Sequence, residues 1–144
     1  GRADVIIMAA AVSDFRPARP STAKLRRRAH TTLRLEATPD LLARLPRRQR
    51  QLVVGFSVET GAVVSRAMHK LRRKRLDLLL AQRVEGRSPF GRRPVQAWLL
   101  ARGGAAKRLG RISKPTVARL LLDKLETLWY GQPYAPGSRA AATA

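Results

Sequence analysis

The chain has 144 residues, 44% of them hydrophobic, and a formal net charge of +21 at pH 7. This length and apolar content suffice for one domain with one core. The absence of cysteine excludes disulfides, a thiolate nucleophile and a Cys-ligated zinc, which fits a reducing cytoplasm. No apolar run approaches the roughly 20 residues that a membrane span needs, so we expect a cytoplasmic protein without membrane contact.

The charge comes from 30 basic residues against 9 acidic ones. Such an excess favours a polyanionic partner, and nucleic acid is the first candidate. The basic residues are spread over nearly every segment, however, and two Trp, two Tyr and three Phe offer few platforms on which bases could stack. A basic nucleic-acid-binding module therefore stays open as an alternative, and otherwise we expect only nonspecific binding of nucleic acid.

The first predicted element is a strand from Asp4 to Ala11. It is a continuous apolar run that ends in charge and a proline, which is typical of a strand buried on both faces in a parallel sheet. Its three alanines allow a ligand to approach closely where the strand ends. Asp14 follows at the position where ligands bind in open parallel sheets.

The next predicted elements are a strand and a short helix. Thr32 to Glu36 alternates apolar and polar residues, which predicts a strand with one buried face. Thr38 is the expected helix N-cap, with Pro39 at the first helical position and Asp40 at the positive end of the helix dipole. The start of such a helix can bind a phosphate or a base edge.

Gln51 to Phe56 and Leu76 to Ala81 are further apolar runs that predict buried strands. Between them, Thr60 is expected to cap an amphipathic helix from Gly61 to Arg75. Right-handed crossovers then make the strands parallel, including Val5 to Ala10.

The remaining elements are a hairpin and a final helix. Val95 to Ala101 and Ala106 to Ile112 flank Gly103-Gly104 and predict the hairpin, and Ser113 is the expected cap of the helix. Residues 1–130 thus predict an α/β domain, a three-layer Rossmann-like fold with a mostly parallel sheet. Residues 131–144 are rich in Gly, Pro, Ser and Ala and are expected to form a flexible tail.

Several short segments carry a family resemblance. They are Met-Ala-Ala-Ala-Val-Ser-Asp-Phe-Arg-Pro from Met8, Lys24-Leu25-Arg26-Arg27, Thr38-Pro39-Asp40-Leu41, Val54 to Thr60, and Lys70 to Lys74 followed by Leu76-Asp77-Leu78. In this order they resemble bacterial phosphopantothenate-cysteine ligase, the synthetase part of the bifunctional coenzyme A biosynthesis flavoprotein. The similarity covers roughly Ala3 to Leu128.

The resemblance implies a ligase that activates 4'-phosphopantothenate with CTP and Mg2+, releases pyrophosphate, and lets cysteine displace CMP. It also implies a homodimer in which two subunits complete each site. The resemblance also implies an opening strand and a Gly-rich phosphate turn that would precede Gly1, and FMN only in a decarboxylase half, which we do not expect within these residues. A noncatalytic remnant of the same fold is a further alternative. No Gly-x-x-x-x-Gly-Lys motif, His-rich metal cluster or Ser, His and Asp constellation supports another enzyme class.

The resemblance also implies site residues by position. Lys24 matches a catalytic lysine, Asp14 a metal-binding residue, and Ala10 and Ala11 the substrate contacts. The implied nucleotide-binding residues are Met8, Ala9, Ala10, Asp14, Lys24, Thr38, Pro39, Asp40, Leu41, Phe56, Lys70 and Lys74. The chain departs from the family pattern in Arg26 and Arg27 for lysines, Thr38 for asparagine, and Gln82-Arg83 for Asn-Asp.

Overall fold

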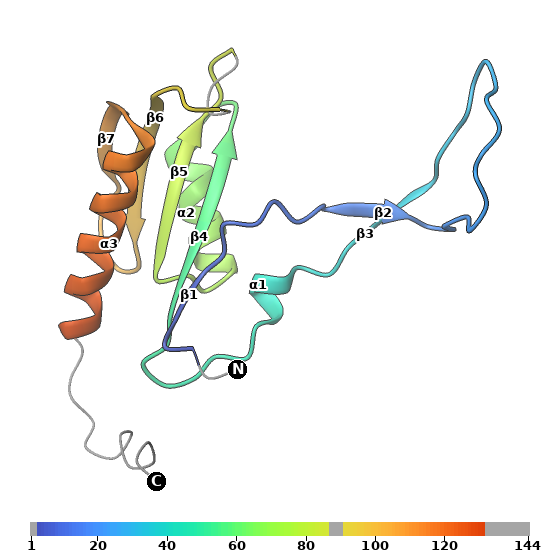
Figure 1. The fold of residues 1–144 in the computed structure, drawn as a ribbon. Coiled ribbons are helices and arrows are strands. Elements are labelled where there is room, and N and C mark those ends of the chain that lie inside the picture. The colour runs from blue at the N-terminus through green and yellow to red at the C-terminus, as the bar shows by residue number, and fades with distance from the viewer. Residues whose placement is uncertain (1–2, 87–90, 132–144) are drawn as a thin grey trace, which may run out of the picture.

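The computed structural model describes residues 3–86 and 91–131. Figure 1 shows a sheet with helices on both faces and one long projection. The elements in chain order are β1 (Val5–Ile7), β2 (Phe15–Pro17), β3 (Leu35–Ala37), α1 (Leu41–Arg44), β4 (Leu52–Glu59), α2 (Val63–Arg73), β5 (Leu78–Arg83), β6 (Val95–Ala101), β7 (Lys107–Ile112) and α3 (Lys114–Tyr130).

The described residues form a five-stranded sheet with the order β1-β4-β5-β6-β7 and a separate two-stranded sheet of β2 and β3. Strand β4 pairs in parallel with both β1 and β5. The pairs β5-β6 and β6-β7 are antiparallel, so the C-terminal hairpin extends the parallel part of the sheet. The predicted parallel strands and hairpin are confirmed.

Helix α3 covers one face of the large sheet, and α2 with the short α1 segment covers the other. Alternate side chains of the central strands pack with Val117, Leu121 and Leu125 of α3. The opposite set packs with α2, whose Ala67 and Leu71 are buried. This arrangement of helix, sheet and helix confirms the three-layer α/β class predicted from the sequence.

The prediction that the first strand is buried on both faces is wrong. Strand β1 has only three residues, and Val5 and Ile7 are exposed. The physical reason is position: within the described residues β1 is an edge strand that pairs only with β4, and only Ile6 packs on the core. Strand β1 ends at Ile7, and the amide of Met8 then donates to the Val54 carbonyl of β4 at 2.9 Å.

A long projection, which we call the arm (residues 15–37), extends from the body of the molecule (Figure 1). Its base is the antiparallel pair of β2 and β3, and its outer part has no regular structure. The predicted strand from Thr32 to Glu36 is observed only as Leu35–Ala37, with every residue exposed, so the expected buried face is absent. The alternation predicted a strand, but no core lies beside it.

Two predicted caps are also wrong. The carboxylate of Asp40, rather than Thr38, caps α1 by accepting from the Ala43 amide at 3.2 Å. Helix α2 begins at Val63 after Ala62, which has a φ of 46° and makes no side-chain cap, so Thr60 does not cap it. The Ser113 cap of α3 is confirmed by its hydrogen bond from the Thr116 amide.

Residues 132–144 of the predicted tail lie outside the described residues. Of the helices that the structure describes, none has the length and apolar character to cross a bilayer.

Candidate functional site

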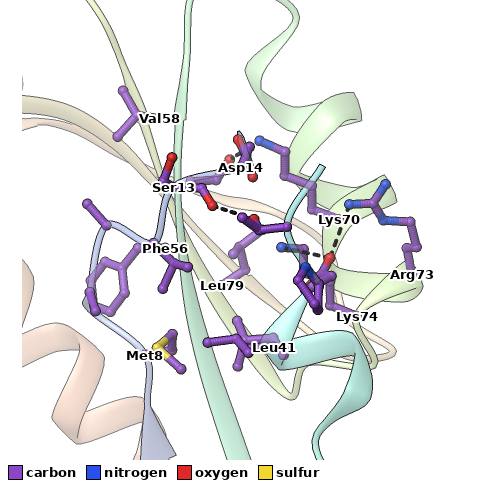
Figure 2. Close-up of a pocket in the computed structure, with 18 residues that line it drawn as sticks. Met8, Ser13, Asp14, Leu41, Phe56, Val58, Lys70, Arg73, Lys74 and Leu79 are labelled. Atoms are coloured by element: carbon purple, nitrogen blue, oxygen red, sulfur yellow. Dashed lines mark hydrogen bonds and ion pairs between the residues drawn. The ribbon is translucent and has the colours of Figure 1, made fainter. Parts of the chain in front are cut away.

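A cleft of about 360 Å³ opens beside β1 and β4. Its walls come from the segment after β1, the segment between β3 and α1, the outer half of β4, and α2. This is the carboxyl end of the parallel strands, the edge at which open α/β sheets bind ligands. In Figure 2 the apolar side chains of Met8, Leu41 and Phe56 gather at one end, and the charged side chains of α2 at the other.

The charged end of the cleft is built by α2. Lys70 and Lys74 are one helical turn apart, and both line the cleft together with Arg73. Figure 2 shows all three side chains extending from α2 toward the cleft. Three cations from adjacent positions of one helix face give this end an affinity for anions.

Lys70 is held by a buried carboxylate. Its ammonium donates to Glu59 Oε1 at 2.6 Å and to Ser57 Oγ at 3.1 Å. Ser57 and Glu59 lie on one face of β4, both are buried, and the Ser57 hydroxyl donates to the same carboxylate oxygen. Arg66 lies 3.9 Å from Glu59 Oε2. Glu59 therefore anchors a small polar cluster at the edge of the apolar core.

Lys74 is held by a second carboxylate from a different element. Its ammonium lies 3.1 Å from Asp40 Oδ2, and the Arg73 guanidinium lies 3.5 Å from the same oxygen. Since Asp40 also caps α1, one side chain joins the start of α1 to the basic end of α2. The two lysines of the cleft thus have separate supports.

The two segments that connect the arm to the body of the molecule form another wall of the cleft. The Thr38 hydroxyl donates to the Ser13 carbonyl, and its amide donates to the Asp14 carbonyl at 2.9 Å. Ser13, Asp14 and Thr38 all line the cleft. Among the described residues the Asp14 carboxylate has no hydrogen-bond or ion-pair partner, so it is free to bind a ligand.

The structure brings most of the sequence-predicted site residues together. Ala9 and Lys24 do not line the cleft, and Lys24 lies exposed in the outer part of the arm. The predicted residues that line the cleft are Met8, Ala10, Ala11, Asp14, Thr38, Pro39, Asp40, Leu41, Phe56, Lys70 and Lys74.

Sequence reasoning missed Ser57, Glu59 and Arg73. Glu59 is a carboxylate in an otherwise apolar strand run, which is the signal that could have revealed it. A buried charge needs a partner, and Lys70 of the next helix is the cation it meets.

Both supporting carboxylates are more acidic than usual. Burial by itself would raise the pKa of Glu59, but the hydrogen bonds from Lys70 and Ser57 and the charges of Lys70 and Arg66 outweigh it, so the pKa lies below its usual 4.5. Burial likewise opposes the shift at Asp40. The Ala43 amide, then Lys74 and Arg73, nevertheless lower its pKa below the usual 3.8.

These pKa shifts predict an acid-sensitive fold. A folded-state pKa below the unfolded one means that each carboxylate contributes stability above its unfolded pKa, and this contribution is lost as pH falls through the lower folded pKa. We expect the free energy of unfolding, measured by urea denaturation, to decline below about pH 4.5. The variant Glu59→Gln, Asp40→Asn should show a shallower decline.

The control for this pH series is Glu126→Gln, since Glu126 is exposed on α3 and has no ion pair among the described residues. An equal acid dependence in the wild type, the control and the double variant would contradict the assignment of this stability to Glu59 and Asp40.

Fold and cleft together define a Rossmann-like α/β domain with a cleft at the carboxyl ends of its parallel strands, where domains of this class bind ligands. Within that class, the sequence profile described as "DNA/pantothenate metabolism flavoprotein C-terminal domain" matches residues 1–128. The chain belongs to this family.

Individual relatives agree with the family assignment. The chain is 38% identical over 143 residues to the coenzyme A biosynthesis bifunctional protein CoaBC of Mycobacterium tuberculosis, covering 90% of this chain and 34% of that protein. The corresponding protein of Thermococcus kodakarensis is 33% identical over 130 residues, with 87% of this chain and 31% of the relative covered.

A solved structure, the C-terminal domain of CoaBC, superposes with a TM-score of 0.67 at 28% identity, covering 90% of this chain and 56% of the other. The chain therefore spans about a third of the length of these curated relatives and just over half of that solved domain.

Proposed function

We propose that this chain is the C-terminal part of a phosphopantothenate-cysteine ligase domain that acts in coenzyme A biosynthesis. The observation that carries the proposal is the cleft, which gathers Asp14, Phe56, Lys70 and Lys74 from three separate segments. Family membership and the curated relatives, named as coenzyme A biosynthesis proteins, support it.

The proposed reaction has two steps. The carboxylate of 4'-phosphopantothenate attacks the α-phosphorus of CTP, the bond between the α- and β-phosphates breaks, and pyrophosphate leaves. The amine of cysteine then attacks the acyl carbon of the cytidylate, loses a proton, and displaces CMP as the amide forms. Both the carboxylate and the triphosphate are anionic, so their mutual repulsion must be screened.

The residues of the cleft fit these tasks. Lys70 and Lys74 would screen the phosphate charge that builds up in the transition state. The half-exposed ring of Phe56 would contact the nucleotide at the apolar end of the cleft. The small side chains of Ala10 and Ala11 line the cleft and would leave room for the substrate carboxylate.

Magnesium fits the free carboxylate of Asp14. Mg2+ is usually held by one or two carboxylates together with substrate phosphates, and Asp14 is the cleft carboxylate that lacks a cation partner. Among the described residues no group of three or more His, Cys, Asp or Glu side chains could hold a metal by itself. Bound Mg2+ would neutralise phosphate oxygens and orient the triphosphate.

Lys24 requires a second part of the proposal. It lies on the arm, outside the cleft of its own chain, so it would act only where an arm closes over a cleft. We propose a homodimer in which the arm of one subunit brings Lys24 to the cleft of the other. The exposed, projecting arm supports this arrangement (Figure 1).

The proposal is tested with the full-length gene product, because the chain spans only part of its relatives. We expect pyrophosphate release that depends on CTP, Mg2+, 4'-phosphopantothenate and cysteine, with each omission as a control and ATP tested beside CTP. Binding of CTP should survive moderate salt, whereas diffuse binding of nucleic acid should weaken steeply with salt.

Three other outcomes would change the assignment. Absence of CTP- or ATP-dependent pyrophosphate release, together with tight RNA binding at high salt, would establish the nucleic-acid-binding alternative instead. Absence of both activities would favour a noncatalytic remnant. Activity of a strictly monomeric protein would exclude the shared site.

A further inference from the structure

Glu59 is the most buried acidic side chain of the ion pairs around the cleft, with 6% of its side chain exposed. It ends β4 on the face that packs against α2, level with Arg83 of β5. A carboxylate in such a position needs compensation by cations and hydrogen bonds, since an unpaired charge there would be strongly unfavourable. Lys70 and Ser57 supply that compensation.

The same contacts fix Lys70. A lysine has four rotatable side-chain bonds and loses roughly 2 kcal/mol of rotamer entropy when it is fixed. The Lys70 ammonium is already fixed by Glu59 and Ser57, while its side chain remains 38% exposed at the cleft. An ammonium has three N-H donors. Two are directed to Glu59 and Ser57, which leaves the third for an anion in the cleft.

The two cleft lysines differ in how firmly they are held. Lys74 is held by Asp40, which caps the four-residue helix α1 and is shared with Arg73. Lys70 is held by residues of β4, a strand paired on both sides within the sheet. Lys70 is therefore the cation whose place is set by the rigid part of the fold.

Resting on the function proposed above, we infer that Glu59 is a positioning residue for nucleotide binding, which acts by holding the ammonium of Lys70 at the triphosphate end of the cleft. Two effects of Glu59 oppose each other. Its negative charge repels a triphosphate, so removing the charge alone would tighten binding. Its hydrogen bond with Lys70 holds that ammonium in place to bind a phosphate, so loss of this hydrogen bond weakens binding of the triphosphate. The two effects can be distinguished by whether CTP affinity rises or falls when the charge of Glu59 is removed.

The experiment compares CTP affinity and steady-state kinetics of wild type and Glu59→Gln in the full-length protein. We expect affinity for CTP to fall about tenfold, with a corresponding rise in KM for CTP and a smaller change in kcat. Glu126→Gln removes the same charge from an exposed site on α3 and should bind CTP like the wild type. Unchanged or tighter binding by Glu59→Gln overturns the inference.

A double-mutant cycle tests whether Glu59 acts through Lys70. If it does, adding Glu59→Gln to Lys70→Ala causes no further loss of CTP affinity. A general structural role predicts an additional loss in the double variant, and that result overturns the inference. Ser57→Ala is the milder variant for the case in which Glu59→Gln does not fold, because it removes one of the two Lys70 partners and leaves the charge in place. We expect a loss of about threefold, and wild-type affinity in Ser57→Ala would contradict the inference.

The outcomes also separate this inference from the proposed function. If the wild type binds CTP and Glu59→Gln binds it equally well, only the role of Glu59 is wrong. If the wild type and all variants fail to bind either CTP or ATP, both the function and the inference are wrong.

Discussion

Replacing Lys70 or Lys74 by alanine in the full-length protein is expected to weaken CTP binding by about 10- to 100-fold. Each lysine lines the charged end of the cleft, and loss of one phosphate ligand costs about 1 to 3 kcal/mol. Diffuse binding of nucleic acid should hardly change, because each variant removes one of 30 basic residues. Titration calorimetry with CTP and Mg2+ measures the first effect, and a fluorescent oligonucleotide measures the second.

The matched control for these variants is Lys107→Ala. Lys107 is exposed on β7, outside the cleft, and its removal changes the net charge by the same amount. Lys70→Ala also leaves Glu59 with the Ser57 hydroxyl and the more distant guanidinium of Arg66, so the folding of this variant must be checked by thermal denaturation. Equal CTP affinity in Lys70→Ala, Lys74→Ala and the control would contradict the proposed triphosphate site.

Asp77→Ala is expected to lower the free energy of unfolding by about 3 kcal/mol. One oxygen of Asp77 accepts from the Arg47 guanidinium at 2.5 Å and from the Val53 amide at 2.8 Å, and the other lies 3.3 Å from Arg102. The Asp77 and Arg47 side chains are only 16% and 19% exposed, so solvent screens this pair weakly. Alanine leaves the Val53 amide without its side-chain acceptor and the poorly solvated Arg47 guanidinium with only the Gln51 carbonyl among the described contacts.

Urea denaturation measures this loss of stability, and two further variants serve as comparisons. Asp77→Asn retains an oxygen for the Val53 amide and should lose less stability than alanine does. Glu36→Ala breaks the exposed pair with Arg16 on the arm, which should be worth less than about 1 kcal/mol. A loss at Asp77 no larger than that at Glu36 would show that the contacts of Asp77 with Arg47, Val53 and Arg102 contribute little to stability.

The strands of the large sheet could be predicted from the sequence because their apolar runs report burial directly. Strands β4 and β5 overlap the predicted ranges, Gln51 to Phe56 and Leu76 to Ala81. Strand β4 continues further, to Glu59, and β5 begins and ends two residues later, at Leu78 and Arg83. The exposure of β1 could not be predicted in this way. An apolar run states what a strand can bury, whereas its neighbours in the sheet decide what it does bury.

The helix starts show a different limit of sequence reasoning. Thr38 and Asp40 are both good cap residues, so the local sequence does not choose between them. The choice is made by the bond from Thr38 to Ser13, which is 25 positions away in the chain. Likewise, a carboxylate in a buried strand indicates that Glu59 needs a cation, but the sequence does not identify that cation as Lys70, because the two meet only where β4 and α2 pack together.

Most members of the candidate site were named through family resemblance rather than from physical pattern. Phe56, Lys70 and Lys74 looked individually like a strand residue and an ordinary basic helix face. Their convergence with Asp14 in one cleft required the fold. The position of Lys24 on the arm depends on long-range geometry that the charge run from Lys24 to Arg28 does not encode.

The cleft has two walls of unequal stiffness. The wall made by β4 and α2 belongs to the close-packed core, whereas Ser13, Asp14 and Thr38 continue directly into the arm. A pair of three-residue strands with exposed side chains has little stability in water, so the free energy needed to open it is small. A ligand therefore contacts one rigid wall and one flexible wall. A partner that binds the arm would also restrict the motion of the flexible wall and so change the affinity of the cleft.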